Sequence, residues 1–259
     1  IRPFTIMTYK TKALVLKTVK YGETSMVITL FTELFGLQAY MVNGVRSSKP
    51  GQNKMAMYQP ASLLDLEVYR QPQKNLQRIK EANRSYLSKE IHSDVIKNSI
   101  ALFMVELLYN SLKEPEENAD LFYFCEDAFI SLDEADKTVA ANFSLFFCLQ
   151  IIHFLGFSLD NPSPALLKGS HLYFDLLDGQ FTNEEPTHAD YLKDDYARLT
   201  AELLKVRQPE ELKYLQLNQA TRRELLKKYL DFYKFHIPNF GRMRSLEILQ
   251  QIWSDGATD

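Results

Sequence analysis

Lysine and arginine side chains, which can bind phosphate groups, are concentrated at the start of the chain. The 259 residues carry a net charge of -3, but residues 1–85 contain thirteen Lys and Arg against five Asp and Glu, a net +8. The rest of the chain carries seventeen against twenty-eight, a net -11. A separately folded segment of charge +8 is typical of a phosphate-binding surface, and a lysine-rich solvated surface is the alternative. The candidate phosphate ligands are Lys12, Lys17, Lys20, Arg46, Lys49 and Lys54.

Tyrosines alternate with these cations along the same segment. Exposed aromatic rings in a basic groove stack on nucleic-acid bases, and each stacking contact contributes about 1 to 3 kcal/mol. Packing in the core or at its rim is the alternative for each ring. The candidate stacking residues are Tyr21, Tyr40 and Tyr58, and Tyr69 belongs to the same series.

A second group of cations lies near the end of the chain. Residues 86–212 carry nine basic and twenty-three acidic side chains, whereas residues 213–245 carry eight basic and two acidic ones. On a helix Arg223 and Lys227 share one face, and like charges four residues apart repel unless an anion compensates them. DNA or an acidic protein segment would supply that anion, and a solvated charged face is the alternative. This second basic patch comprises Arg222, Arg223, Lys227, Lys228, Lys234, Arg242 and Arg244.

Four acidic residues near position 130 offer an enzymatic alternative. Asp127, Asp133, Glu134 and Asp136 have the side chains of a carboxylate-metal nuclease. They lie beside a predicted helix end without a basic partner, and we interpret them as a solvated acidic rim. No Gly-rich phosphate loop follows a predicted strand, so nucleotide hydrolysis is not suggested. The sequence therefore predicts a binding protein rather than an enzyme, with no catalytic residue.

The first cations lie on segments whose apolar pattern predicts a small β-barrel. Residues 63–69 alternate strictly, with Leu64, Leu66 and Val68 pointing inward and Asp65 and Glu67 outward. The other segments are rich in β-branched and aliphatic residues, which suit a pleated surface. Five short strands within about seventy residues are typical of an OB-type barrel. The expected strands are residues 11–20, 25–32, 37–43, 63–69 and 76–82.

From about residue 88 the apolar period changes from two to 3.6 residues, which predicts helices. Residues 143–157 are apolar nearly all round, as in a helix at the centre of a bundle. Residues 160–186 interrupt the helical pattern and indicate an inserted hairpin that turns at Asp178 and Gly179. The predicted fold is α+β: an OB-type barrel followed by an all-α bundle. The other expected helices lie at 91–108, 121–132, 191–206, 218–235 and 245–253.

The length of the chain favours two domains. We expect the barrel in residues 1–84, with 1–6 as an extension, and the helical domain in 85–259. No apolar run approaches a membrane span, and the start lacks the apolar core of a secretion signal. Cys125 and Cys148 lie in apolar helical patterns, which are typical of buried free thiols. These features predict a protein of the reducing cytoplasm.

Six short blocks along the chain resemble the bacterial RecO recombination mediators. Each block is weak alone, but together they are specific because their spacing extends across nearly the whole chain. The blocks are Lys12-Ala-Leu-Val-Leu-Lys, Tyr21-Gly-Glu-Thr-Ser, Leu30-Phe-Thr-Glu-Leu-Phe-Gly36, Asn43-Gly-Val-Arg-Ser-Ser, Gln59-Pro-Ala-Ser-Leu-Leu-Asp-Leu and Gly241-Arg-Met-Arg-Ser-Leu.

The resemblance implies an OB barrel followed by a helical domain, as the residue patterns predict independently. It also implies binding of single- and double-stranded DNA, annealing of complementary strands and pairing with RecR. Recognition of the acidic tail of single-stranded-DNA-binding protein, so that RecA can be loaded, belongs to the same family role in recombinational DNA repair. An RNA-binding OB module of translation or ribosome assembly is the alternative, and a preference for structured RNA over DNA would favour it.

The sequence departs from the resembled family at one site. Many relatives carry a four-cysteine zinc site after the central apolar helix, but residues 156–186 contain no cysteine. A structural zinc ion takes about four Cys or His ligands, and His171 and His188 are too few. We therefore expect no zinc and no other cofactor, and a hairpin held by packing of Leu172, Phe174 and Phe181. Stoichiometric zinc in metal analysis of the purified protein would contradict this expectation.

Overall fold

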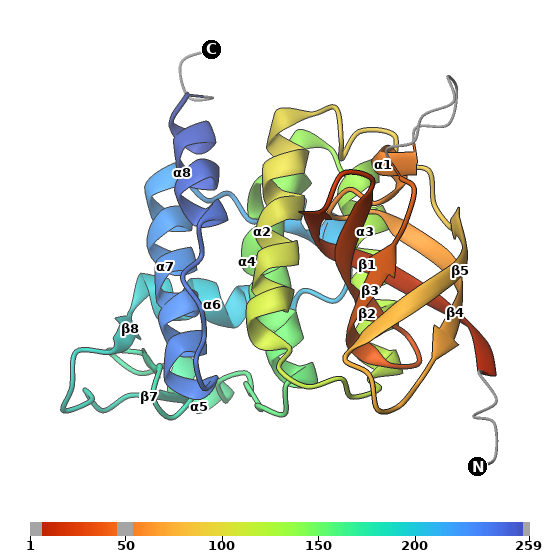
Figure 1. Cartoon of the computed structure of the whole chain (residues 1–259). Coiled ribbons are helices and arrows are strands. Elements are labelled where there is room, and N and C mark those ends of the chain that lie inside the picture. The colour runs from red at the N-terminus through yellow and green to blue at the C-terminus, as the bar shows by residue number, and fades with distance from the viewer. Residues whose placement is uncertain (1–6, 46–53, 256–259) are drawn as a thin grey trace. The chain divides into compact units, whose positions relative to one another are not determined.

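The computed structural model describes residues 7–45 and 54–255 (Figure 1). The chain divides into two compact units. The barrel unit consists of the chain up to Asp94 together with Leu108–Asp133, and the helical unit consists of Val95–Leu107 together with the chain from Glu134. This division differs from the predicted boundary after residue 84, because residues 108–133 pack with the barrel.

The five strands of the barrel unit pair in a closed ring, in the order β1-β2-β3-β5-β4 (Figure 1). Neighbouring strands are antiparallel except β3 and β5, which pair in parallel over a short stretch. This is the predicted five-stranded OB-type fold. The strands are β1 (Met7–Tyr21), β2 (Ser25–Thr32), β3 (Gly36–Val42), β4 (Leu63–Arg70) and β5 (Leu76–Arg84), and the short helix α1 (Lys54–Met57) precedes β4.

Strand β1 begins earlier than predicted because it pairs with two partners in succession. It pairs with β4 from Met7 and with β2 from Ala13, and its register on β2 shifts between Val15 and Lys17. Such an irregularity lets one long strand bend around a ring. The alternation predicted for β4 is confirmed, because Leu64, Leu66 and Val68 lie in the barrel core with Ala13 and Val15.

Helix α3 (Ala119–Glu134) packs on the outside of this ring. Leu14 and Phe31 are fully buried although they lie outside the barrel core, and the ring centroid of Phe31 lies 5.6 Å from that of Phe122 on α3. Gly36, at the turn from β2 to β3, has a φ of +58°, and a Cβ there would lie 2.0 Å from the carbonyl oxygen of Glu116. Only glycine permits this close approach, which fixes the segment before α3 against the barrel.

The helical unit is organised around α4 (Lys137–Phe154), which contacts α6 (Asp195–Lys205), η1 (Pro209–Tyr214) and α7 (Gln219–His236). Asp136 caps its start by accepting hydrogen bonds from the backbone N–H groups of Thr138 and Val139. Among the described helices, α4 is long and apolar enough to cross a membrane, but most of it is buried, as in a core helix. The other helices are α2 (Val95–Ser111), which runs on into the barrel unit, α5 (Pro164–Leu167) and α8 (Ser245–Asp255).

The predicted hairpin forms, but it is part of a three-stranded sheet of order β7-β6-β8. Strands β6 (Tyr173–Asp175) and β7 (Gln180–Thr182) are joined through Gly179, whose φ is +68°. Leu172 and Phe174 are buried, and the ring of Phe174 lies 4.7 Å from that of Phe181. Strand β8 (Tyr191–Lys193) lies on the other side of β6, so the expectation of a helix beginning at residue 191 was wrong.

Candidate nucleic-acid interface

The end of β1, just before the turn into β2, carries two of the predicted phosphate ligands and one predicted stacking residue. Lys17 and Lys20 are exposed, and the Tyr21 side chain is 60% exposed. Gly22, with a φ of +62°, allows the tight turn that follows them. The Nζ atom of Lys17 lies 4.8 Å from the ring centroid of Tyr109, at the end of α2. The Lys17, Lys20 and Tyr21 side chains are all exposed to solvent, where a polyanion can reach them.

The loop from β4 to β5 and the strand ends beside it carry cations that the sequence prediction did not single out. Lys74 and Arg78 are exposed, and the Arg70 guanidinium lies 4.2 Å from the ring centroid of Phe35. Residues 69–80 contain four Lys and Arg and no acidic residue. In OB folds the loop between strands 4 and 5 takes part in binding oligonucleotides. The positive charge of residues 69–80 was therefore a signal in the sequence that could have identified this loop.

Buried amides fix the shape of this loop. Gln77 donates a hydrogen bond to the carbonyl oxygen of Gln71 at 2.8 Å and accepts one from the Gln71 N–H at 2.9 Å. From β3, Gln38 donates to the carbonyl oxygen of Asn75 at 2.6 Å. Because these side-chain amides satisfy backbone groups of the loop, Lys74 in the loop and Arg78 just after it lie on an ordered backbone.

A cavity of about 330 Å³ lies across the outer face of β2 and β3. Thr29, Leu37 and Ala39 line it from the strands, and Tyr109 and Pro115 line it from the end of α2 and the segment that follows. Arg70 at the end of β4 and Lys74 in the β4–β5 loop add two cations, and the lining contains no acidic side chain among the described residues. In OB folds the face of strands 2 and 3, with the β1–β2 and β4–β5 loops, is the surface that binds oligonucleotides.

Lys12 does not join this surface. Its Nζ atom contacts both carboxylate oxygens of Glu126 on α3, at 2.7 and 2.9 Å. The hydrogen bond to Glu126 raises the pKa of the Lys12 ammonium group. Because a carboxylate already compensates this charge, Lys12 anchors α3 to β1, and its predicted role as a phosphate ligand is not supported.

Tyr40 and Tyr58 are core residues, and their prediction as stacking platforms was wrong. Tyr40 is 1% exposed and Tyr58 is 6% exposed, and both belong to the barrel core. Burial raises the pKa of the Tyr40 hydroxyl to about 12. Arg46 and Lys49 lie outside the described residues, as does the side chain of Lys54, which begins α1.

In the second basic patch, several guanidinium groups already bind other groups of the protein. Arg222 and Arg223 donate hydrogen bonds to the carbonyl oxygens of Leu217 and Gln250, and Arg242 pairs with Glu247. Lys227 and Arg244 are exposed. The arginines of α7 therefore have structural contacts, and the accessible charge of the patch is smaller than the sequence count indicates.

The four acids of the enzymatic alternative have separate positions. Asp127 and Glu134 are exposed, whereas Asp136 caps α4. Asp133 is 1% exposed, so its interpretation as part of a solvated rim was wrong. Among the described residues, no three His, Cys, Asp or Glu side chains form a group that could hold a metal ion.

The Asp133 carboxylate holds the segment that follows the barrel. It accepts hydrogen bonds from the backbone N–H groups of Lys89, Glu90 and Ile91 at 2.7 to 2.9 Å and from the Tyr86 hydroxyl at 2.9 Å. Burial opposes its ionisation, but these four donors outweigh burial and lower the pKa of the carboxyl group. Asp133 is thus a structural residue of the barrel unit.

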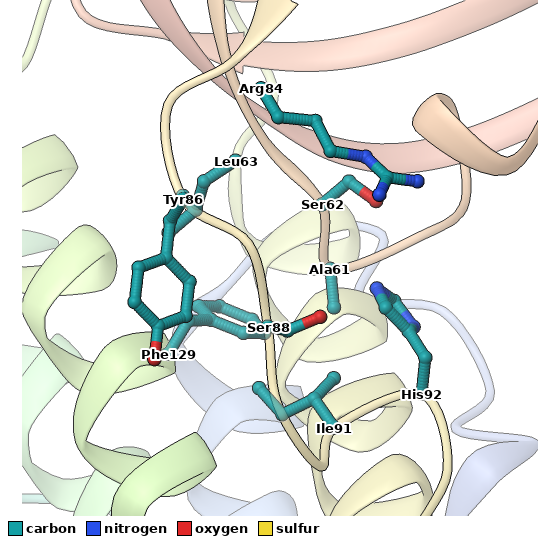
Figure 2. Close-up of a pocket in the computed structure, with 9 residues that line it drawn as sticks. All are labelled: Ala61, Ser62, Leu63, Arg84, Tyr86, Ser88, Ile91, His92 and Phe129. Atoms are coloured by element: carbon teal, nitrogen blue, oxygen red, sulfur yellow. The ribbon is translucent and has the colours of Figure 1, made fainter. Parts of the chain in front are cut away.

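Figure 2 shows a small pocket beside this segment, where Arg84 and His92 point toward the same space as the Ser62 hydroxyl. Its volume is about 20 Å³, which is room for one water molecule and not for a substrate. The Arg84 guanidinium donates to the carbonyl oxygen of Ala56 at 2.9 Å. Partial burial and the charge of Arg84 lower the pKa of His92. The pocket has the size of a hydration site rather than of an active site.

Comparison with known proteins shows to which protein family the chain is related. The family models "Recombination protein O N terminal" and "Recombination protein O C terminal" match residues 7–86 and 92–247. The protein of Flavobacterium psychrophilum named "DNA repair protein RecO" is 34% identical over 254 residues, which cover 96% of this chain and 100% of the relative. The protein of the same name from Phocaeicola vulgatus is 32% identical over 248 residues, again covering 96% of this chain and 100% of the relative. The chain therefore belongs to the RecO family, whose members act in DNA repair and recombination.

Proposed function

We propose that this chain is a non-catalytic recombination mediator. It binds single-stranded DNA on its barrel, anneals complementary strands and, with RecR, helps to load RecA onto DNA coated by single-stranded-DNA-binding protein. The observation that supports this proposal is a pair of exposed cationic segments beside the β2–β3 face. Residues 17–24, at the end of β1 and the turn into β2, carry Lys17 and Lys20, and residues 69–80, around the β4–β5 loop, carry Lys74 and Arg78. Membership of the RecO family favours DNA over RNA as the ligand.

Annealing requires electrostatic interactions between this surface and the DNA phosphates. Two complementary strands repel each other through their phosphates, and lysine and arginine side chains lower that repulsion by replacing condensed counterions. An annealing protein needs no bond-making group, because base pairing supplies the driving force once the strands are held together. The exposed side chains of Lys17, Lys20, Lys74 and Arg78 project from strand ends and the β4–β5 loop, where they can follow the flexible backbone of a single strand.

The second basic patch is the proposed contact for the acidic tail of single-stranded-DNA-binding protein. Its exposed side chains Lys227 and Arg244 have the charge that an acidic peptide requires. Such a contact would leave the barrel available for DNA while the chain is bound to the coating protein. The proposed place of action is the cytoplasm, at the nucleoid.

The proposal is tested by annealing of complementary oligonucleotides coated with the cognate single-stranded-DNA-binding protein. We expect the wild-type chain to accelerate annealing, and the rate to return to background when Lys17, Lys20, Lys74 and Arg78 are all replaced by Ala. We expect the same loss when the coating protein lacks its acidic tail. Absence of annealing by folded wild-type protein would contradict the proposal, as would preferential binding of structured RNA in competition with DNA.

A further inference from the structure

Tyr109 lies between cationic and apolar side chains on the surface of the barrel unit. It lies in the last turn of α2, and its half-buried side chain lines the 330 Å³ cavity on the β2–β3 face. The Lys17 Nζ atom lies 4.8 Å from the centroid of the ring and 3.5 Å from its hydroxyl oxygen. The ring is therefore held beside a cation that faces solvent.

The remainder of the cavity suits a flat, partly polar group with a phosphate attached. Leu37, Ala39 and Pro115 offer apolar surface, and the Thr29 hydroxyl offers a hydrogen-bonding group. Arg70 and Lys74 supply positive charge. The volume of about 330 Å³ lies at the lower end of the range for sites that bind small organic molecules. An aromatic wall with cations on two sides is the combination that binds single-stranded nucleic acid.

We propose that this cavity is a subsite for one unpaired nucleotide, whose base stacks on Tyr109 while Lys17, Arg70 and Lys74 hold its flanking phosphates. The proposal rests on the DNA-binding function proposed above and deepens it. In a duplex each base is covered by its neighbours on both faces, so only an unpaired base can occupy such a subsite. Tyr109 thus gives the barrel a means of distinguishing single strands from duplexes, which loops of lysine and arginine alone do not provide.

The test compares three variants on two ligands. We expect Tyr109→Ala to weaken binding of a short oligothymidylate about tenfold, equivalent to about 1.4 kcal/mol, and to change binding of a duplex of equal length less than twofold. Tyr109→Phe keeps the ring and should bind as the wild type does. Tyr214→Ala removes a tyrosine that is 74% exposed in the helical unit, and it serves as the matched control with unchanged affinity. Equal losses on both ligands, or no loss, would overturn the proposal.

A second measurement covers the case in which Tyr109→Ala perturbs the fold. Wild-type protein is titrated with an oligonucleotide whose bases have been removed but whose phosphates remain. We expect the wild type to bind this abasic strand about tenfold more weakly than it binds oligothymidylate. Tyr109→Phe should show the same difference in affinity between the two strands. Equal affinity of wild type for the two strands would overturn stacking. If the wild type binds neither strand, the proposed function itself is contradicted. If its affinity depends steeply on salt but is equal for the two strands, only the nucleotide subsite is contradicted.

Discussion

Replacement of Lys17, Lys20, Lys74 and Arg78 by Ala in one variant is expected to weaken binding of single-stranded DNA by about 100-fold in about 0.1 M salt. All four side chains are exposed: Lys17 and Lys20 lie near the end of β1, Lys74 lies in the β4–β5 loop, and Arg78 lies near the start of β5. Each phosphate contact contributes roughly -0.7 to the slope of log affinity against log salt concentration. The slope should therefore become less steep by up to about 3. Fluorescence anisotropy of a labelled oligothymidylate, titrated at several salt concentrations, measures both quantities.

The chain offers a control that removes the same charge elsewhere. Lys168, Lys205, Arg207 and Lys213 are four exposed cations of the helical unit. Their replacement by Ala changes the net charge of the protein equally, but it leaves residues 17–24 and 69–80 intact. We expect the affinity for DNA to change by less than about threefold and the salt slope to stay near the wild-type value. Equal loss in both variants would show that net charge, rather than the barrel surface, governs binding.

Replacement of Asp133 by Ala is expected to lower the free energy of unfolding by about 3 to 5 kcal/mol. The substitution leaves three backbone N–H groups and the Tyr86 hydroxyl without their carboxylate acceptor, in a place where Asp133 itself is 1% exposed. Each buried donor that loses its acceptor costs about 1 to 3 kcal/mol. Chemical denaturation followed by circular dichroism measures the change. Asp127→Ala removes an exposed acid from the same helix and should alter stability by less than about 0.5 kcal/mol.

The Asp133 contacts also predict a dependence on pH. The folded protein lowers the pKa of this carboxyl group, so its contribution to stability is fully present above the unfolded pKa of about 3.9. That contribution is lost as the pH falls through the folded value, because the protonated carboxyl group is a poorer acceptor. Wild-type protein should therefore lose stability below about pH 4 more steeply than Asp133→Asn does. Parallel pH profiles for the two proteins would contradict this assignment.

The barrel could be predicted from the sequence because its core positions follow a local pattern. Leu64, Leu66 and Val68 alternate with polar residues, and the strand therefore has one apolar face whatever its partners are. The same reasoning failed for Tyr40, since it shares a strand face with the polar Gln38 and alternation contains no inward signal there. Tyr58 lies outside any strand, so its burial depends on how the segment before β4 folds back onto the core.

Features that depend on distant partners were not predictable in the same way. The four donors to Asp133 lie 42 to 47 residues earlier in the chain, and nothing near position 133 indicates them. Glu126 compensates the charge of Lys12 across 114 residues. Strand β8 forms because Tyr191 to Lys193 find β6 as a pairing partner, although the local pattern favours a helix. Charge counts along the sequence therefore overestimated the accessible cations and missed the fixed loop from β4 to β5.

Hydrogen exchange of the full chain, with and without a short oligothymidylate, would show directly whether single-stranded DNA binds to the barrel unit. We predict slower exchange in residues 17–24 and 69–80 on addition of the oligonucleotide, together with the last turn of α2. Exchange in α6 and in the sheet formed by β6, β7 and β8 should not change. Protection confined to α7 and α8, with none in residues 17–24 and 69–80, would contradict binding on the barrel and assign the DNA to the second basic patch.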